Sequence, residues 1–239
     1  MLIGYDTAQD PCVLSAVRSS LESNITAGLL LNGYGTVPDG LAVADNGIEK
    51  GVQAVAAHVL DQMDGFFSTK NAADLHFAAA KIHDSLRAAS SKIRKIAHYI
   101  GQGIYMGGVI AYFSGSDYIL IPFGGGTAYT YDNAALVRQG ASASPDGFIR
   151  DAVGGAEPWS AKVWKGKLGP AGCLILATDE LPATQETRQR IASAGTPGNH
   201  IDTAAMMLRR SVENGSRFPA AVMILRHAAA SGEETASRE

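Results

Sequence analysis

Glycine-rich segments and histidines are the first features of this chain that could do chemistry. Gly101 and Gly103 have one residue between them, and 124–126 is a run of three glycines. Such segments cradle phosphate groups when they follow a strand and open a helix. Neither segment has that context, so tight turns and close approach of strands are the favoured interpretation. The histidines also lack the spacing of three or four residues that holds zinc on one helix face; they are His58, His76, His83, His98, His200 and His227.

The cysteines indicate a reducing compartment rather than a catalytic thiol. Cys12 and Cys173 are the only two in the chain, too few for a disulfide framework. Cys173 lies in an apolar run that predicts a core strand, so burial is favoured over nucleophilic function.

Hydrophobic periodicity predicts the elements that must position any site. Two long helices are expected over 48–63 and 72–99, the second broken near Ser90-Ser91. A strand over 25–31 is expected to end in a turn at 32–35. Further strands are expected over 107–113, 118–122, 127–131, 161–164, 173–178 and 219–225, and further helices over 184–194 and 203–213. Strands grouped apart from helices predict an α+β layered domain over residues 1–227, followed by a disordered tail at 228–239.

Composition excludes several classes of protein. The 239 residues carry 20 basic and 23 acidic side chains, a formal charge of −3. That balance argues against nucleic acid as a partner and against a polybasic membrane-surface protein. No apolar run approaches the ~18–20 residues of a membrane span, and the N-terminus lacks the features of a signal peptide. A cytoplasmic protein is expected.

Several segments, taken in order, resemble the metal-dependent protein phosphatases of type 2C. That family has an Asn-(Glu/Gln)-Asp segment, an Asp-Gly-(His/Met)-Gly strand end, a Gly-Asp-Ser-Arg strand, a Leu-Gly-Gly, a Ser-Asp-Gly and a final Arg-Asp-Asn strand. The matching segments here are Ala8-Gln9-Asp10, Asn32-Gly33-Tyr34-Gly35, 123–129, Val153-Gly154-Gly155, 174–181 and 214–222. The resemblance spans residues 1 to about 226 and implies a four-layer αββα sandwich, two antiparallel sheets flanked by helices.

The resemblance implies a cleft that holds two divalent cations, and three residues keep a metal-associated role by position. Asp10 matches the N-terminal Asp, Gly33 can supply a backbone carbonyl, and Asp179 matches the Asp of Ser-Asp-Gly. Alternatives remain for both carboxylates. Asp179 can cap the turn or helix that follows its strand, and Asp10, before Pro11, can be a solvated residue at a strand start.

Four other positions depart from the family pattern. Asn32 replaces the Asp that bridges the two cations, and Phe218 replaces the final Asp. Gly125 replaces the Asp of Gly-Asp-Ser-Arg, and Tyr5 stands where the phosphate-binding Arg would be. Two dications ~4 Å apart repel by roughly 16 kcal/mol at an effective dielectric near 20. Loss of two carboxylates leaves that repulsion poorly offset.

These departures predict a pseudophosphatase, non-catalytic or strongly impaired, that acts by binding an unidentified protein or phosphoprotein. Its cofactor would be absent, or a weakly bound Mg²⁺ or Mn²⁺. The alternative is an active metal-dependent Ser/Thr protein phosphatase with an atypical, weak metal site. An unrelated small-molecule enzyme on the same scaffold is a third class, since fold alone does not determine function.

Overall fold

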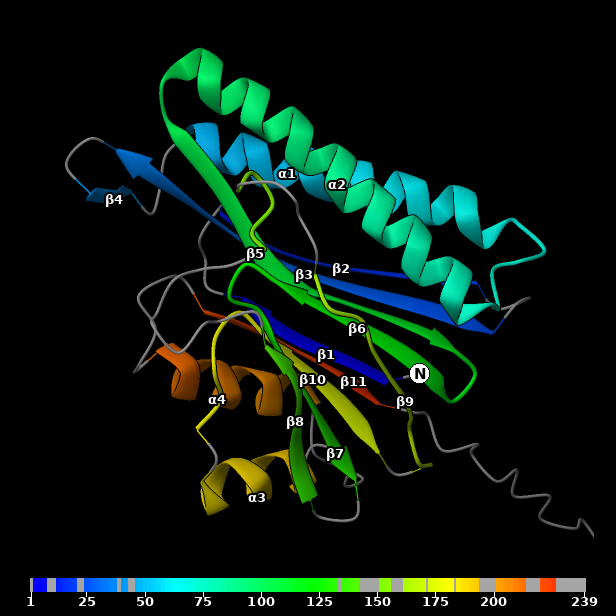
Figure 1. The fold of residues 1–239 in the computed structure, drawn as a ribbon. Helices are drawn as coiled ribbons and strands as arrows, with labels where there is room; N and C mark the ends of the chain where they lie inside the picture. The colour runs from blue at the N-terminus through cyan, green and yellow to red at the C-terminus, as the bar shows by residue number, and fades with distance from the viewer. Residues whose placement is uncertain are drawn as a thin grey trace, which may run out of the picture.

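Two antiparallel sheets stacked face to face form the centre of the molecule, with a pair of helices outside each (Figure 1). The computed structural model describes residues 2–7, 12–20, 24–37, 40–42, 46–132, 135–141, 151–155, 161–170, 172–182, 184–193, 201–213 and 220–226. This is the four-layer αββα arrangement that the sequence predicts. The expected tail at 228–239 lies outside the described residues.

The first sheet has five strands, in the spatial order β1-β11-β10-β7-β8. The second has six: five in the order β2-β3-β5-β6-β9, and β4 paired with the end of β3. The first sheet contains β1 (Leu2–Thr7), β11 (Ala221–Arg226), β10 (Cys173–Ala177), β7 (Thr127–Asp132) and β8 (Ala135–Ala141). The second contains β2 (Val13–Ser20), β3 (Ile25–Val37), β4 (Gly40–Ala42), β5 (Gly103–Ser114), β6 (Asp117–Phe123) and β9 (Trp164–Lys167).

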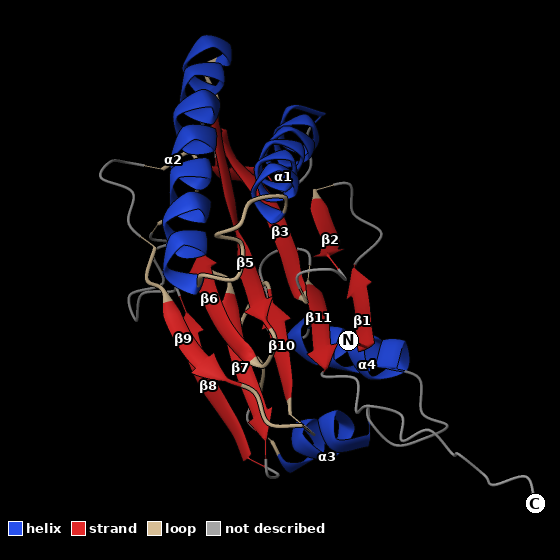
Figure 2. Cartoon of the chain, turned by 90° about the vertical axis from the view of Figure 1, so that its right-hand side faces the viewer, coloured by secondary structure: helices blue, strands red, loops and turns tan. Residues whose placement is uncertain are grey.

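The helices cover the outer faces of the two sheets (Figure 2). α1 (Asn46–Phe67) and α2 (Leu75–Ile100) pack on the second sheet, and α3 (Gln185–Ser193) and α4 (Ile201–Glu213) pack on the first. Asp74 caps α2 by accepting hydrogen bonds from the backbone N–H groups of His76 and Phe77, at 2.8 and 3.2 Å. α2 ends at Gly101, whose φ of +69° suits a glycine C-cap. No helix in the described ranges combines the length and hydropathy that a membrane crossing needs.

Alternation along the strands separates an inner core from two outer ones. On β3, Leu29 and Leu31 face α1 and α2, whereas Leu30 faces the other sheet. On β10, Leu174 and Leu176 point inward, and Ile175 points toward α3 and α4. The inner core therefore joins the strands on which the candidate site residues lie.

Three sequence predictions need correction. The strand predicted to end at Leu31 continues to Val37, because β5 pairs with it along its whole length and β4 pairs with its end. The helix predicted to break near Ser90-Ser91 is continuous, and Ser90 is almost fully buried in it. The list of expected strands also lacked β1, β2, β4 and β8. The strand expected over 161–164 is displaced to Trp164–Lys167.

Burial of Cys173 is confirmed. The residue is 1% exposed on β10, and burial raises the pKa of its thiol to about 12. A thiol with so high a pKa is protonated at neutral pH and is a poor nucleophile.

Two buried serines on α2 are expected to lose different amounts of stability on replacement by alanine. The Ser90 hydroxyl accepts a hydrogen bond of 2.9 Å from the buried backbone N–H of Gly154. Ser90→Ala leaves that N–H unpaired, so we expect a loss of about 1–3 kcal/mol in the free energy of unfolding, measured by urea denaturation.

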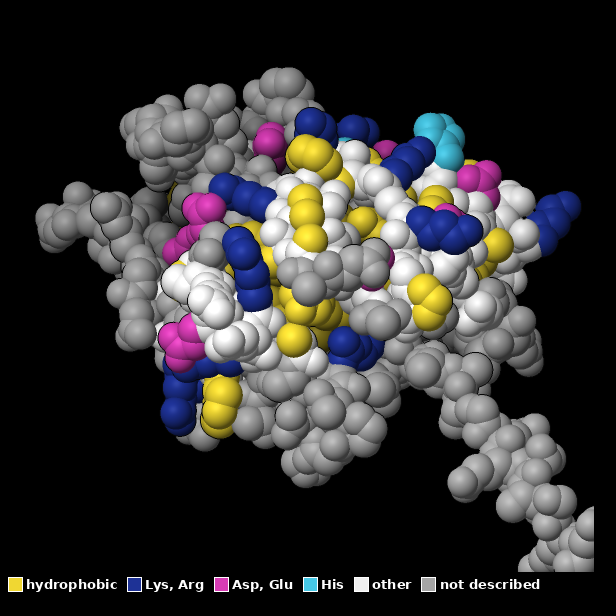
Figure 3. Space-filling view, turned by 90° about the horizontal axis from the view of Figure 1, so that it is seen from below, with side chains coloured by type: hydrophobic (Ala, Val, Ile, Leu, Met, Phe, Trp, Pro, Cys, Tyr) yellow, Lys and Arg dark blue, Asp and Glu magenta, His cyan; other side chains and the backbone are white. Residues whose placement is uncertain are grey.

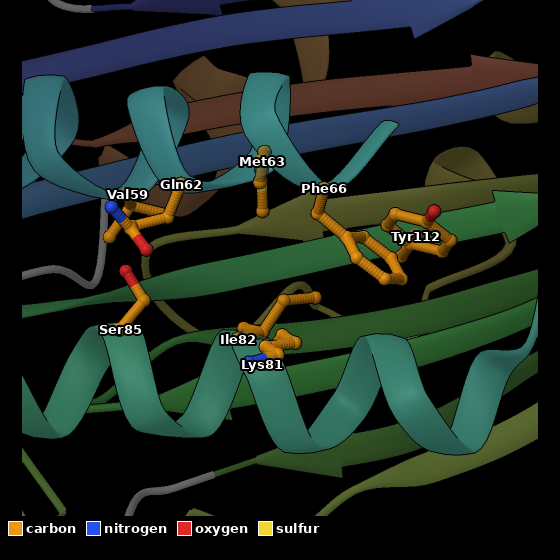
Figure 4. Close-up of a pocket in the computed structure, with 8 residues that line it drawn as sticks. All are labelled: Val59, Gln62, Met63, Phe66, Lys81, Ile82, Ser85 and Tyr112. Atoms are coloured by element: carbon orange, nitrogen blue, oxygen red, sulfur yellow. The ribbon is translucent and has the colours of Figure 1, made fainter. Parts of the chain in front are cut away.

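Ser85 is the matched control for Ser90. It is 6% exposed, and its Oγ has no hydrogen-bond partner among the described residues. The side chain points from α2 toward Gln62 and Val59 of α1, across a cavity of about 30 Å³ (Figure 4). That volume holds one or two waters. Ser85→Ala strands no protein group, so its cost is expected to stay below about 1 kcal/mol. Equal losses in the two variants would contradict this account.

His83 on α2 is expected to make the stability of the fold depend on pH. Burial lowers the pKa of His83, the nearby Arg87 lowers it further, and Asp84 and a backbone hydrogen bond at Ala161 oppose them. The unfolded chain therefore binds the proton more readily. The stability that neutral His83 contributes is present above about pH 6.5 and is lost as pH falls below it. His83→Gln should reduce the stability loss between about pH 7 and pH 5, followed by urea denaturation. An unchanged slope would contradict this assignment.

Candidate functional site

Asn32 lies on the face of β3 that points toward the other sheet. Leu30, two residues earlier, packs in the inner core, and side chains two apart on a strand share a face. Asn32 is 5% exposed, and β3 places it opposite Val13 of β2 and Gly107 of β5. The position that the resemblance gives to the bridging Asp therefore carries a buried, neutral amide.

Gly33 follows on the opposite face and has no room for a side chain. A Cβ at this position would overlap Val52 Cγ2 and would stand 2.8 Å from Ile48 Cγ2, both on α1. Its backbone N–H donates a hydrogen bond of 2.8 Å to the carbonyl oxygen of Cys12. Close packing of α1 on β3 thus explains why this residue is glycine.

A crossing of glycine backbones links β5 to the turn between β6 and β7. A Cβ on Gly107 would overlap the carbonyl oxygen of Gly124, and a Cβ on Gly126 would overlap the carbonyl oxygen of Gly108. The prediction that these glycines serve a tight turn and a close approach is confirmed. Gly125, at the tip, has a φ of +97°, a conformation in which a side chain is strained.

Asp179 directly follows β10 and bonds to its own chain. Its Oδ1 accepts a hydrogen bond of 2.7 Å from the backbone N–H of Glu180. Its carbonyl oxygen accepts one of 2.5 Å from the Thr127 hydroxyl at the start of β7. The Glu180 side chain pairs with Arg138 at 2.7 Å. The described contacts of the Asp179 carboxylate are those of a residue that shapes the turn after its strand.

These contacts bring four of the sequence-predicted positions to one end of the sandwich. Asn32, with Gly33 beside it, is paired with Gly107, and Gly107 lies against Gly124. Gly125 follows in the same turn, and Thr127, two residues later, bonds to Asp179. This end is built from β3, β5, β7 and β10 and combines strands of both sheets.

Three predicted positions have no described side chain. Tyr5 lies on β1, where its backbone is paired with Met223 of β11, but its side chain is outside the described part. Asp10 and Phe218 fall outside the described residues altogether. Their roles stay predictions.

Sequence reasoning missed two threonines that hold this end together. Thr127 bonds to Asp179, and the hydroxyl of Thr178 accepts a hydrogen bond of 3.0 Å from the backbone N–H of Ala221 on β11. Both are buried. For Thr178, a hydroxyl directly after the apolar strand β10 was the available signal.

The donors described at this end do not fit two divalent cations. They comprise one carboxylate, one neutral amide and backbone carbonyls, whereas Mg²⁺ and Mn²⁺ in paired sites need carboxylates to offset their repulsion. Within the described ranges, no group of three or more His, Cys, Asp or Glu side chains is placed to hold a metal ion.

The fold is that of the type 2C Ser/Thr phosphatases. No protein-family model matches the sequence, and no curated protein does either. Solved structures match over almost the whole chain. The serine/threonine phosphatase of S. agalactiae superposes with a TM-score of 0.73 at 10% identity, over 95% of this chain and 99% of that one.

Two further solved structures share the architecture. PppA, a key regulatory component of the T6SS in Pseudomonas aeruginosa, gives a TM-score of 0.67 at 12% identity, over 95% of this chain and 97% of that one. The catalytic domain of the phosphatase PstP in complex with two manganese ions gives 0.62 at 17% identity, over 93% and 95%. At these identities the likeness establishes the fold.

Proposed function

We propose that this chain is a type 2C phosphatase-like protein with negligible metal-dependent turnover, which acts by binding a protein or phosphoprotein. The observation that carries the proposal is the burial of Asn32, a neutral side chain at the position that the resemblance gives to the bridging carboxylate. The two cysteines are buried and form no disulfide, which supports a cytoplasmic location as part of the same proposal.

Electrostatics supports impaired catalysis. An amide oxygen can coordinate one cation but brings no charge to offset the repulsion between two. The Asp179 carboxylate already accepts a backbone hydrogen bond, at 2.7 Å. Any cation bound here is expected to be single and weakly held.

Substrate binding is weakened at a further position. The resemblance gives the phosphate-binding Arg to the place of Tyr5, which pairs in β1 next to β11. A tyrosine hydroxyl cannot make the bidentate, charge-assisted contact that a guanidinium makes with phosphate. Even with a metal bound, the substrate phosphate would lack this anchor.

Turnover measured with excess metal tests the proposal. The full chain is incubated with millimolar Mn²⁺ and either a phosphoserine peptide or an aryl phosphate, with and without chelator. We expect release of phosphate indistinguishable from that of the Asp179→Ala variant. Robust turnover that both chelator and Asp179→Ala abolish would overturn the proposal and establish the active phosphatase with an atypical metal site.

A further inference from the structure

A groove lies between α2 and β9, far along β6 from the glycine turn. β9 pairs with the start of β6, Asp117 to Leu120, whereas the turn follows Phe123 at its end. Figure 2 shows the N-terminal part of α2 beside β9. The groove has a volume of about 450 Å³, within the range of sites that bind ligands in other proteins.

The shape of the groove suits an extended chain. On α2 the lining residues His76, Ala80, His83 and Arg87 follow helical spacing and form one continuous face. The eleven residue-to-residue steps from His76 to Arg87 cover about 16 Å of helix. An extended segment of about five residues spans the same length. On the other wall, Val163 and Lys165 are two residues apart at the start of β9, an edge strand of its sheet among the described strands.

The charge of the groove is positive. Arg87 and Lys165 contribute cations from opposite walls, and among the described residues Asp84 is the only acidic one that lines it. Asp84 pairs with Arg87 at 3.4 Å, but their side chains are 67% and 58% exposed, so the pair is weak and leaves Arg87 open to a second anion.

The surroundings extend this charge. Lys162 lies over the Trp164 ring, 4.1 Å from its centroid, at the same end of β9. The sequence has no Asp or Glu between Asp84 and Asp117, and the nearest acidic residue before Asp84 is Asp74, which caps the N-terminus of α2. The face seen in Figure 3 intersperses basic, acidic and hydrophobic side chains.

We propose that the groove between α2 and β9 binds an extended acidic segment of a partner protein. Carboxylates of the segment contact Arg87 and Lys165 on the two walls. Small apolar side chains between them pack on Ala79, Ala80 and Val163. The groove and the candidate metal end are different surfaces, so the result of the turnover assay does not decide whether the groove binds such a segment.

Two labelled peptides provide the test: one of alternating Glu and Ala residues, and one of alternating Gln and Ala residues. Binding to the full chain is measured by fluorescence anisotropy and located by NMR of the backbone amides. We expect the Glu peptide to bind at least about tenfold more tightly than the Gln peptide. Its affinity should fall as salt rises from about 0.05 M to about 0.5 M. The amides of residues 76–87 and 163–165 should shift.

Charge reversal on each wall distinguishes binding in this groove from general attraction of the acidic peptide to the protein surface. Arg87→Glu and Lys165→Glu should each weaken the Glu peptide at least about tenfold. Lys50→Glu, an exposed lysine on α1, changes the net charge equally and should weaken it less than about threefold. Thermal unfolding of all three variants confirms that they are folded.

Four outcomes would overturn the proposal. The first two are equal affinity for the two peptides and no binding of either. The third is that Lys50→Glu weakens binding of the Glu peptide as much as the groove variants do. The fourth is that the NMR signals of the groove amides shift with protein concentration alone, which would indicate a second copy as the occupant. Deletion of residues 228–239 provides a further check. If the deletion shifts the NMR signals of the groove amides without any peptide, the chain's own acidic tail is the occupant and a partner protein is excluded.

Discussion

Gly107→Ala is expected to lower the free energy of unfolding by about 4 kcal/mol or more, or to prevent folding. The added Cβ would overlap the carbonyl oxygen of Gly124. Gly124 cannot retreat easily, because its own Cα also lies against Gly107. The clash is between two backbones, so no side-chain rotation relieves it. Thermal and urea unfolding measure the effect.

Gly65→Ala is the control for this prediction. Gly65 is exposed on α1, and nothing lies within 4 Å of a Cβ built there. Alanine in a helix interior is favoured over glycine by roughly 0.5–1 kcal/mol, so this variant should be slightly more stable than the natural chain. A Gly107→Ala variant as stable as the natural chain would show that β5 and the β6–β7 turn do not cross as described.

Asn32→Asp is expected to destabilise the metal-free protein by several kcal/mol at neutral pH. The position is 5% exposed, and an ionised carboxylate buried without a cation is costly. Burial raises the pKa of such a group above its value of about 3.9 in the unfolded chain. The variant's stability is therefore retained below that value and lost as pH rises through the folded pKa. Urea denaturation with chelator, from about pH 4 to pH 7.5, measures the effect.

Addition of Mn²⁺ should reverse part of this loss if Asn32 occupies a former ligand position, and Phe218→Asp in the same chain should enlarge the recovery. Asn24→Asp, an exposed position on the β2–β3 turn, is the matched control and should respond to neither pH nor metal to the same degree. A loss of stability that Mn²⁺ leaves unchanged would mean that this end was never arranged around cations.

The elements predicted best from sequence are those whose own residues form a clear apolar run or a clear helical period. Cys173–Ala177 is an unbroken apolar run and forms β10. The apolar period from Ile48 to Met63 lies within α1, and the matching residues face the second sheet. β1 and β8 carry mixed residues and were missed, because their strand conformation depends on hydrogen bonds to β11 and β7.

In the candidate site, too, some features could be predicted from the sequence and others could not. The sequence placed Asn32, Gly125 and Asp179 in a common motif order, and the fold that this order implies is the one observed. It could not show that the Asp179 carboxylate bonds to the next backbone N–H, since that depends on the direction the chain takes after β10. Nor could it show the conformation of Gly125, which the crossing at Gly124 imposes.

By itself, the sequence determined the layered α+β class and the buried faces of the main elements. These properties follow from residue type and local periodicity. The tertiary structure alone decided the continuation of β3 through Asn32 and Gly33, the unbroken α2 and the positive groove beside β9. Each of these depends on pairing or packing between residues far apart in the chain, and local sequence does not encode that directly.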